Sequence, residues 1–156
     1  MNIDTYYCTR TATLSDLDSL NELLSQLFQQ EDEFKADIAT QTRGLTEILQ
    51  NPDIGCILVS CETDSQQIVG MVNLLFTIST AFGGKVAWLE DMVVSANFQQ
   101  RGIGNTLLQT AFATAKQQGC KRITLLTDQN NLSAQTFYAK NGFQASGMKP
   151  FRLHLG

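Results

Sequence analysis

The chain has 156 residues, of which 43% are hydrophobic and 17% are charged. These proportions are typical of a soluble globular protein and exclude wholesale disorder, and no apolar run approaches the roughly 20 residues that a membrane-spanning helix needs. The formal net charge is −4, and without a basic stripe this argues against a nucleic acid as the partner. We predict one domain over residues 1–156, which is long enough for one hydrophobic core.

The N-terminus and the cysteines both favour a cytoplasmic protein. Residues 1–4 place no basic segment ahead of an apolar one, so we expect no signal peptide. Cys8, Cys56, Cys61 and Cys120 are scattered and lack C-x-x-C spacing, which indicates reduced, mostly buried thiols. His154 is the only histidine, so we expect no metal ion.

Acidic and basic residues are distributed unevenly along the chain. Residues 1–64 hold twelve acids and three bases, whereas residues 65–156 hold eight bases and three acids. Such a division suits a protein that binds a cationic ligand with its first half and an anionic ligand with its second. Solvated surfaces without a common purpose would give the same pattern.

The first half of the chain predicts one strand, two helices and two further strands. The leucines at positions 17, 20, 24 and 27 repeat at helical spacing, and Ser15 precedes them as a candidate N-cap. Asn51-Pro52 ends the second helix. The predicted strands cover 5–12, 56–61 and 68–78, and the predicted helices cover 15–28 and 40–50.

The second half alternates strands with helices. Gly119 is positioned to end a helix that begins near residue 102, because glycine adopts the left-handed C-cap conformation without strain. The strand–helix–strand unit over 86–127 favours a parallel pair of strands. The predicted strands cover 85–94, 122–127 and one or two segments of 143–155 around Pro150, and the helices cover 102–118 and 131–140.

The segment 99–104, Gln-Gln-Arg-Gly-Ile-Gly, lies between a strand and a helix. Glycines let successive N–H groups face one concavity, and the helix N-terminus adds partial positive charge. Arg101 adds a full charge at its rim. The dinucleotide fingerprint needs glycine or alanine where Leu107 stands, and the Gly-Lys-Ser/Thr of a P-loop is absent. Alone, this segment predicts an anion site, and a simple tight turn would explain it as well.

A second motif follows about thirty residues later, where residues 131–143 read Asn-Leu-Ser-Ala-Gln-Thr-Phe-Tyr-Ala-Lys-Asn-Gly-Phe. Together the two segments resemble the GNAT superfamily of N-acetyltransferases. The cofactor loop of that family reads Gln/Arg-x-x-Gly-x-Gly/Ala, and its later motif reads Asn-x-x-Ala-x-x-Phe/Leu-Tyr-x-x-x-Gly-Phe. Both are matched throughout, and residues 88–94 also look like the family's cofactor-facing strand.

The resemblance implies an α/β GNAT fold, with a mixed central sheet of six to seven strands, about four helices and a splayed cofactor cleft. It implies acetyl-CoA as the acyl donor, with direct transfer that needs no cysteine nucleophile. Backbone amides of the loop would bind the pyrophosphate, and the strand's main chain would pair with the pantetheine arm. Ordinary core packing is the alternative for the apolar members. The implied cofactor-binding residues are Met92, Val93, Val94, Gln99, Gln100, Arg101, Gly102, Ile103, Gly104, Asn105, Asn131 and Phe137.

The candidates for catalysis are Glu90, Asp91 and Tyr138. An amine with a pKa near 10.4 must lose a proton before it attacks, and a carboxylate can accept that proton. Adjacent strand residues face opposite ways, so only one of the two acids faces the cleft unless the bulge that the family carries on this strand falls between them. Glu90 is preferred to Asp91, and a structural pair or a water chain are the alternatives. Tyr138 has the family's proton-donor position, with ring packing as the alternative role.

The acceptor is the least determined part of the prediction. Family selectivity resides in the first two helices and their link, where acids lie beside aromatic residues, and this favours a small cationic amine. The alternatives are a protein N-terminal or lysine acetyltransferase, or a non-catalytic acyl-CoA-binding regulatory module. Family members often dimerise through sheet edges, so a homodimer is a further expectation. The candidate acceptor residues are Phe28, Glu31, Asp32, Phe34, Ser79 and Thr80.

Overall fold

The computed structural model describes residues 3–31 and 34–156, which form two compact units that meet in sequence between Leu126 and Thr127. The first unit is built on one five-stranded sheet in the order β1-β2-β3-β4-β5. Neighbours from β1 to β4 are antiparallel, and β5 is parallel to β4, as the strand–helix–strand unit predicts. The strands are β1 (Tyr7–Thr11), β2 (Gly55–Glu62), β3 (Ile68–Ser79), β4 (Gly84–Val94) and β5 (Ile123–Leu125).

The prediction of six to seven strands is wrong, because the C-terminal tail adds none to the sheet. Residues 143–156 have no strand conformation, and a strand persists only where a neighbouring segment completes its hydrogen bonds. Pro150 also lacks the N–H that a ladder requires. The apolar residues that suggested strands here are between 84% and 93% exposed: Met148, Phe151, Leu153 and Leu155.

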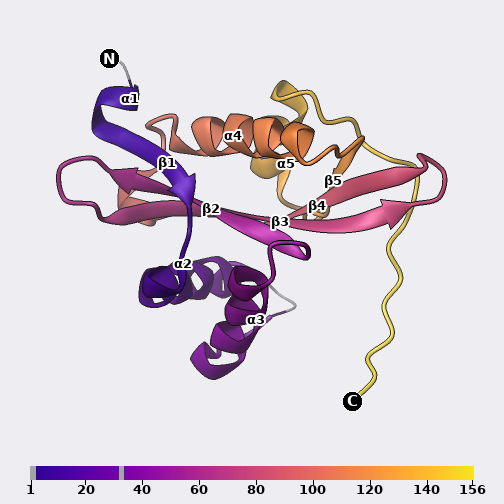
Figure 1. Ribbon diagram of the computed structural model, residues 1–156, viewed down its shortest axis with the longest axis horizontal. Helices are drawn as coiled ribbons and strands as arrows, with labels where there is room; N and C mark the ends of the chain where they lie inside the picture. The colour runs from indigo at the N-terminus through magenta and orange to yellow at the C-terminus, as the bar shows by residue number, and fades with distance from the viewer. Residues whose placement is uncertain (1–2, 32–33) are drawn as a thin grey trace. The chain divides into compact units, whose positions relative to one another are not determined.

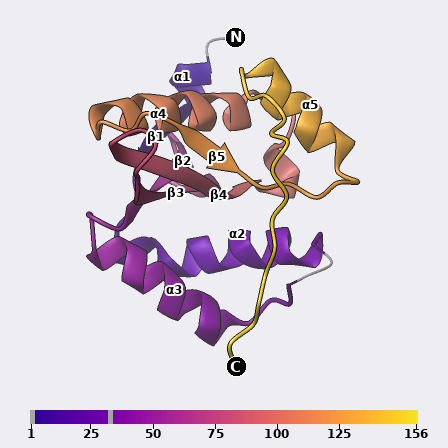
Figure 2. The same ribbon diagram turned by 90° about the vertical axis from the view of Figure 1, so that its right-hand side faces the viewer.

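Helices cover both faces of the sheet in the first unit (Figures 1 and 2). The helices α2 (Leu17–Gln29) and α3 (Ile38–Gln50) lie on one face, and α4 (Ile103–Gln117) lies on the other. The helix α5 (Leu132–Lys140) belongs to the second unit. These four helices agree with the predicted number, and α1 (Ile3–Tyr6) adds a single turn ahead of β1.

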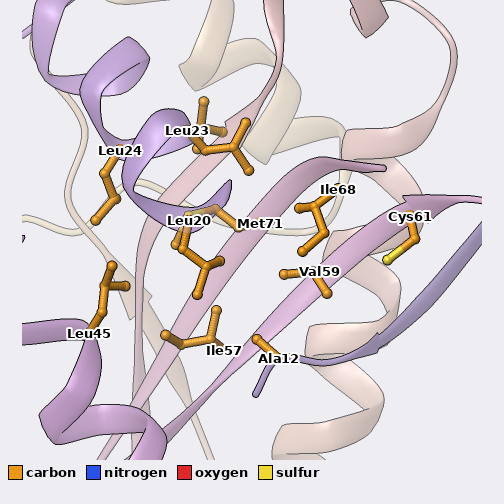
Figure 3. Packing of buried hydrophobic residues seen from close by; sticks show 11 residues of the cluster. Ala12, Leu20, Leu23, Leu24, Leu45, Ile57, Val59, Cys61, Ile68 and Met71 are labelled. Atoms are coloured by element: carbon orange, nitrogen blue, oxygen red, sulfur yellow. The ribbon is translucent and has the colours of Figure 1, made fainter. Parts of the chain in front are cut away.

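The main core lies between the sheet and the α2–α3 pair. Leucines of α2 point toward apolar residues of β2 and β3 (Figure 3), and Leu20, Ile57, Val59 and Met71 are each 0% exposed. Burial of one such side chain stabilises the fold by about 1.5–3 kcal/mol. The helical spacing seen in the sequence therefore reports the face of α2 that the sheet covers.

The helix α2 begins differently from the prediction. Ser15 is not its N-cap; it lies inside the 3₁₀ turn η1 (Leu14–Asp16), which Thr13 precedes. The Asp16 carboxylate accepts a hydrogen bond from the Thr13 N–H at 2.8 Å and two from the Arg10 guanidinium at 2.8 and 3.0 Å. Hydrogen bonding to Arg10 holds the pKa of Asp16 below its ordinary value. This ion pair fixes the start of α2 to β1.

The substitution Asp16→Ala should lower the free energy of unfolding by about 1–3 kcal/mol, because Arg10 and the Thr13 N–H lose a charged partner. Asp18→Ala, which removes an exposed acid from the first turn of the same helix, should cost less than about 1 kcal/mol. Because the pKa of Asp16 is lower in the folded chain than in the unfolded one, its carboxylate stabilises the fold above about pH 3.9. This stabilisation is lost as the pH falls through the folded pKa. Urea unfolding at pH 7 and pH 3 measures both effects, and equal losses for the two variants at pH 7 would contradict the anchoring role.

Candidate active site

The strand β4 carries one extra residue opposite β3. Met71 pairs with Val93 and Asn73 pairs with Glu90, so two steps along β3 face three steps along β4. The extra residue falls at Asp91, whose φ is 52°. A left-handed non-glycine residue at a bulge bends the strand and turns its side chain away from regular alternation. The bulge implied by the family resemblance is thus present just after Glu90.

The strands β4 and β5 part at the same place. Pairing between them covers only three positions, from Ala87–Ile123 to Leu89–Leu125, whereas β4 continues to Val94. In the described sheet, no strand pairs with β4 on the β5 side from Glu90 onward. That edge consequently offers backbone N–H and C=O groups to an extended ligand, as the predicted pantetheine contacts of residues 92–94 require.

Two residues of the loop between β4 and α4 have a left-handed backbone conformation. Gln100 has φ 62° and Gly102 has φ 81°, and Gly102 is the N-cap of α4 with no side-chain hydrogen bond to the first turn. The first N–H groups of a helix have no partner inside the helix. Because a glycine cap supplies no oxygen to them, they remain available to an anion at the positive end of the helix dipole.

Side chains of the loop fasten it to the sheet. The Gln99 amide donates to the Val94 carbonyl oxygen at 3.3 Å. The Arg101 guanidinium donates to the Tyr7 hydroxyl at 3.0 Å and lies 5.0 Å from the centre of the Phe98 ring. Arg101 therefore has neutral partners on β1 and in the loop, which leave its positive charge in place.

Gly70 on β3 sets the approach of α4 to the sheet. A Cβ at this position would lie 3.0 Å from a Leu107 methyl group, 3.3 Å from the Val93 carbonyl oxygen and 3.4 Å from Ile103. A side chain here would displace these neighbours by a few tenths of an ångström, so glycine suits the close packing of the first two turns of α4 against the end of β4. The close contact holds the N-terminus of α4 near the open strand edge.

A cavity of about 270 Å³ lies between α2, α3 and the β3–β4 pair. Two polar residues of the sheet form part of its lining: the Asn73 amide nitrogen donates to an Asp91 carboxylate oxygen at 2.6 Å. Asn73 is 2% exposed. Burial raises the pKa of Asp91, and the hydrogen bond from Asn73 opposes that rise. The lining residues are Leu24, Phe28, Phe34, Lys35, Asp37, Thr40, Gln41, Gly44, Leu45, Ile48, Asn73 and Asp91.

The two predicted carboxylates have different environments. Asp91 lines the cavity, whereas the Glu90 side chain is exposed and is not part of the lining. The extra residue of the bulge is what brings Asp91 into contact with Asn73 across the strand pair. The carboxylate that faces the cavity is therefore Asp91, whereas the sequence favoured Glu90 for that position.

Of the predicted acceptor residues, Phe28 and Phe34 line the cavity, with ring centres 5.8 Å apart. Glu31 is half-buried outside the lining, and Asp32 lies outside the described residues. Ser79 is the last residue of β3 and Thr80 begins the turn to β4. Ser79 lies about 20 Å along β3 from Asn73 at the usual rise per strand residue, and neither Ser79 nor Thr80 lines the cavity.

Sequence reasoning missed Asn73 and Gln41. Asn73 interrupts an otherwise apolar run from Ile68 to Leu75. A buried asparagine in such a strand is unusual enough to indicate a specific partner. This interruption of the apolar run could have identified Asn73 from the sequence. Gln41 is 7% exposed and gave no comparable signal, because its helix is polar on several sides.

The second unit contains the remaining motif residues. Asn131 is the N-cap of α5, and its side-chain oxygen accepts from the Ala134 N–H at 3.0 Å. The Tyr138 ring lies 5.3 Å from the Phe137 ring and 5.6 Å from the Phe143 ring. Burial raises the pKa of Tyr138 to about 12, so its phenol is neutral at pH 7 and holds a proton.

Cysteines, metal clusters and apolar helices add no further site in the part of the chain that the structure describes. Cys61 is buried, Cys56 and Cys120 are half-buried, and Cys8 is exposed. Burial raises the pKa of the Cys56, Cys61 and Cys120 thiols, which makes them poor nucleophiles at neutral pH.

Within residues 3–31 and 34–156, no three His, Cys, Asp or Glu side chains gather into a metal site. No helix of these segments has the length and apolar character to cross a membrane.

Comparison with known proteins gives a consistent set of similarities. YhfO of Bacillus subtilis (strain 168), an uncharacterized N-acetyltransferase, is 29% identical over 124 residues, which cover 78% of this chain and 81% of that protein. Glucosamine 6-phosphate N-acetyltransferase of Trypanosoma brucei brucei is 30% identical over 88 residues, which cover 56% of this chain and 58% of that protein. The matched segment of a chloroplastic relative from Arabidopsis thaliana is 21% of that protein's length.

The solved structure of a possible acetyltransferase from Clostridium difficile 630 has the same fold. It superposes with a TM-score of 0.86 over 96% of this chain and 98% of that one, at 16% sequence identity. The model of the Acetyltransferase (GNAT) family matches residues 17–143, a range that includes β4, the loop, α4 and the whole 131–143 motif. The chain therefore belongs to the GNAT family of acetyltransferases.

Proposed function

We propose that this GNAT acetyltransferase transfers the acetyl group of acetyl-CoA directly to a primary amine of a small molecule. The observation that carries the proposal is the bulge at Asp91. Asp91 lines the cavity under α2 and α3, and it belongs to the part of β4 whose other edge has no partner strand. A donor held on the edge and an acceptor held in the cavity would therefore react at one point.

The donor would lie along β4, with its pyrophosphate at the start of α4. The N–H groups of residues 100–104 would bind the phosphates, because the glycine cap leaves them without a side-chain acceptor. The pantetheine arm contains amide groups, which can pair with the main chain of Met92, Val93 and Val94 as an added strand would. The reactive thioester would then lie near the bulge.

Asp91 is the proposed general base. An amine with a pKa near 10.4 is protonated at pH 7, and a carboxylate whose pKa is raised by burial accepts its proton more readily than an exposed one. The amine nitrogen then attacks the thioester carbonyl carbon and the C–N bond forms. The C–S bond breaks with its electron pair staying on sulfur, and the nitrogen releases its second proton to solvent. A backbone N–H of the bulged strand would stabilise the carbonyl oxygen as negative charge develops.

Because Tyr138 matches the family's proton-donor position in the motif 131–143, we propose that it assists the departing sulfur. With a pKa of about 12, its phenol is a weaker acid than a thiol with a pKa near 8.5, so complete transfer to a free thiolate would be unfavourable by about 5 kcal/mol. A hydrogen bond from the phenol to the sulfur has no such cost, and it strengthens as negative charge forms. We therefore assign Tyr138 a stabilising hydrogen bond, with the thiolate drawing its final proton from solvent.

The cavity is large enough for a small primary amine. A volume of about 270 Å³ equals that of about nine water molecules in the liquid, which holds a side-chain-sized molecule. Bound acetyl-CoA without turnover of any amine would instead favour the non-catalytic binding module.

Asp91→Asn should lower kcat/KM for an amine acceptor by about 10²- to 10⁴-fold, while Glu90→Gln should stay within a few fold of wild type. Thiol release from acetyl-CoA over a panel of amines measures this. The acid limb of the wild-type pH profile should lie above pH 3.8, because burial raises the pKa of Asp91, and Asp91→Asn should lack it. A large loss in Glu90→Gln alone would reassign the base.

Asp91→Asn should also raise the free energy of unfolding at pH 7. A carboxyl whose folded pKa lies above its unfolded value destabilises the fold as pH rises through that range, and the neutral amide removes this cost. Thermal unfolding at pH 7 and pH 4 measures the difference, which should shrink at the lower pH. Equal stabilities at pH 7 would show that Asp91 is not desolvated.

Gly102→Ala should weaken CoA binding by about tenfold or more, because a side chain at φ 81° strains the loop that presents the N–H groups. Gly119→Ala is the matched control: Gly119 also has φ 81° but stands at the other end of α4, in open space. The two variants should lose similar stability, and only the first should lose affinity in titration calorimetry. Equal CoA affinities would remove the loop from the binding site.

Tyr138→Phe should lower kcat by about 10- to 100-fold at unchanged KM for acetyl-CoA, the effect of losing one hydrogen bond to a charged atom. Tyr6→Phe, at an exposed tyrosine of α1, is the control and should leave kcat unchanged. If Tyr138→Phe retains full kcat, the tyrosine serves only to pack its ring.

A further inference from the structure

We infer that the acceptor is a primary amine on an uncharged apolar body, such as an arylalkylamine, with its nitrogen bound between the Asn73 side-chain oxygen and the Asp91 carboxylate. This inference rests on the proposed function, and it names the class of substrate for the same cavity. Three features of the cavity carry it: its unpartnered oxygen, its apolar wall and its satisfied polar residues.

The first feature is an unpartnered acceptor atom on Asn73, a residue that lines the cavity. The Asn73 amide nitrogen donates to Asp91, but its Oδ1 atom is buried and has no hydrogen-bond partner. A buried carbonyl oxygen without a donor is unfavourable, so a ligand that supplies an N–H or O–H is favoured there. The neighbouring Asp91 carboxylate also accepts hydrogen bonds. A ligand group that satisfies both acceptors needs at least two donor hydrogens, which an amine has and an alcohol lacks.

The second feature is the apolar wall opposite these two residues. Leu24 and Leu45 are 4% and 2% exposed and line the cavity with Phe28, Phe34 and Ile48. The Phe28 and Phe34 rings, 5.8 Å apart and tilted by 48°, offer an aromatic surface. An apolar body of the acceptor would be removed from water against this wall, whereas a sugar would leave its hydroxyl groups without partners.

The third feature is that two other polar lining residues, Gln41 and Asp37, already have hydrogen-bond partners. The Gln41 amide nitrogen donates to the Asn21 carbonyl oxygen and side-chain oxygen, both at 3.2 Å, and its oxygen accepts from the Asp37 N–H at 2.9 Å. Asp37 in turn accepts from the Thr40 N–H at 3.3 Å and hydroxyl at 3.1 Å. Among the lining residues, only the Asn73 oxygen is a buried side-chain atom without a partner. Gln41 and Asp37 therefore require no polar group from the ligand.

The charges of the lining do not suit a second ionic group on the acceptor. Apart from Asp91, the charged lining residues are Lys35 and Asp37, which are opposite in sign, and no arginine lines the cavity. A phosphate would lack the several cationic donors that usually hold it. A polyamine would bring further ammonium groups to apolar residues and to one already bonded carboxylate.

The test compares four acceptors with the wild-type protein: 2-phenylethylamine, spermidine, glucosamine 6-phosphate and glycine, each with acetyl-CoA and thiol release as the readout. We expect kcat/KM for 2-phenylethylamine to exceed each of the others by about 100-fold or more. A hydrophilic amine as the best acceptor would overturn the substrate class and leave the proposed function standing. If no amine caused thiol release while CoA still bound, the proposed function itself would be overturned.

Two measurements test the role of the Asn73 oxygen. Asn73→Leu, of similar size, should raise KM for 2-phenylethylamine at least tenfold with unchanged CoA affinity, whereas Thr77→Leu at an exposed site of the same strand should change neither. With the wild-type protein, 2-phenylethanol, which has one donor hydrogen, should bind at least tenfold more weakly than the amine in competition. Equal binding of the alcohol and the amine, or an unchanged KM in a folded Asn73→Leu, would overturn the assignment.

Discussion

The extra residue in β4 at Asp91 changes three properties of the strand at once. It shifts the register with β3, so that Met71 and Asn73 face residues three apart on β4. It bends the strand at the point where its pairing with β5 ends. It also brings a carboxylate into contact with a buried asparagine at the cavity. A regular strand could not have all three properties. Continuous pairing would use its backbone groups in the sheet, and strict alternation would fix the side on which each side chain lies.

These features oppose stability locally. Asp91 adopts a left-handed backbone conformation, its carboxylate is desolvated and the Asn73 oxygen has no partner. Each is unfavourable in the isolated protein, and the surrounding core offsets them. The apolar cluster beneath α2 and α3 packs around the same strands, so the sheet stays ordered although one point of it is strained. Such local exceptions to folding rules concentrate at functional sites.

The loop before α4 divides its work between side chains and backbone. Gln99 and Arg101 bond to Val94 and Tyr7 and hold the loop in place. The N–H groups near Gly102, which the protein leaves uncapped, face no such structural demand. The motif glutamine is thus explained by a structural contact, and the glycine by backbone geometry. Close packing of α4 over Gly70 keeps this helix start beside the end of β4.

The family, the order of most elements and the loop that opens α4 could be predicted from the sequence, because these depend on local signals. Leucine spacing identified α2, and the glycines and glutamine of residues 99–104 identified the helix start. The tail misled the prediction: alternating apolar residues near Pro150 suggested strands, yet a strand depends on a partner that the sequence does not name. Tertiary structure alone decided between Glu90 and Asp91 as the residue at the cavity, because the bulge is a relation between two strands. It also revealed Asn73, whose unpartnered oxygen exists only when β3, β4 and the two helices enclose it.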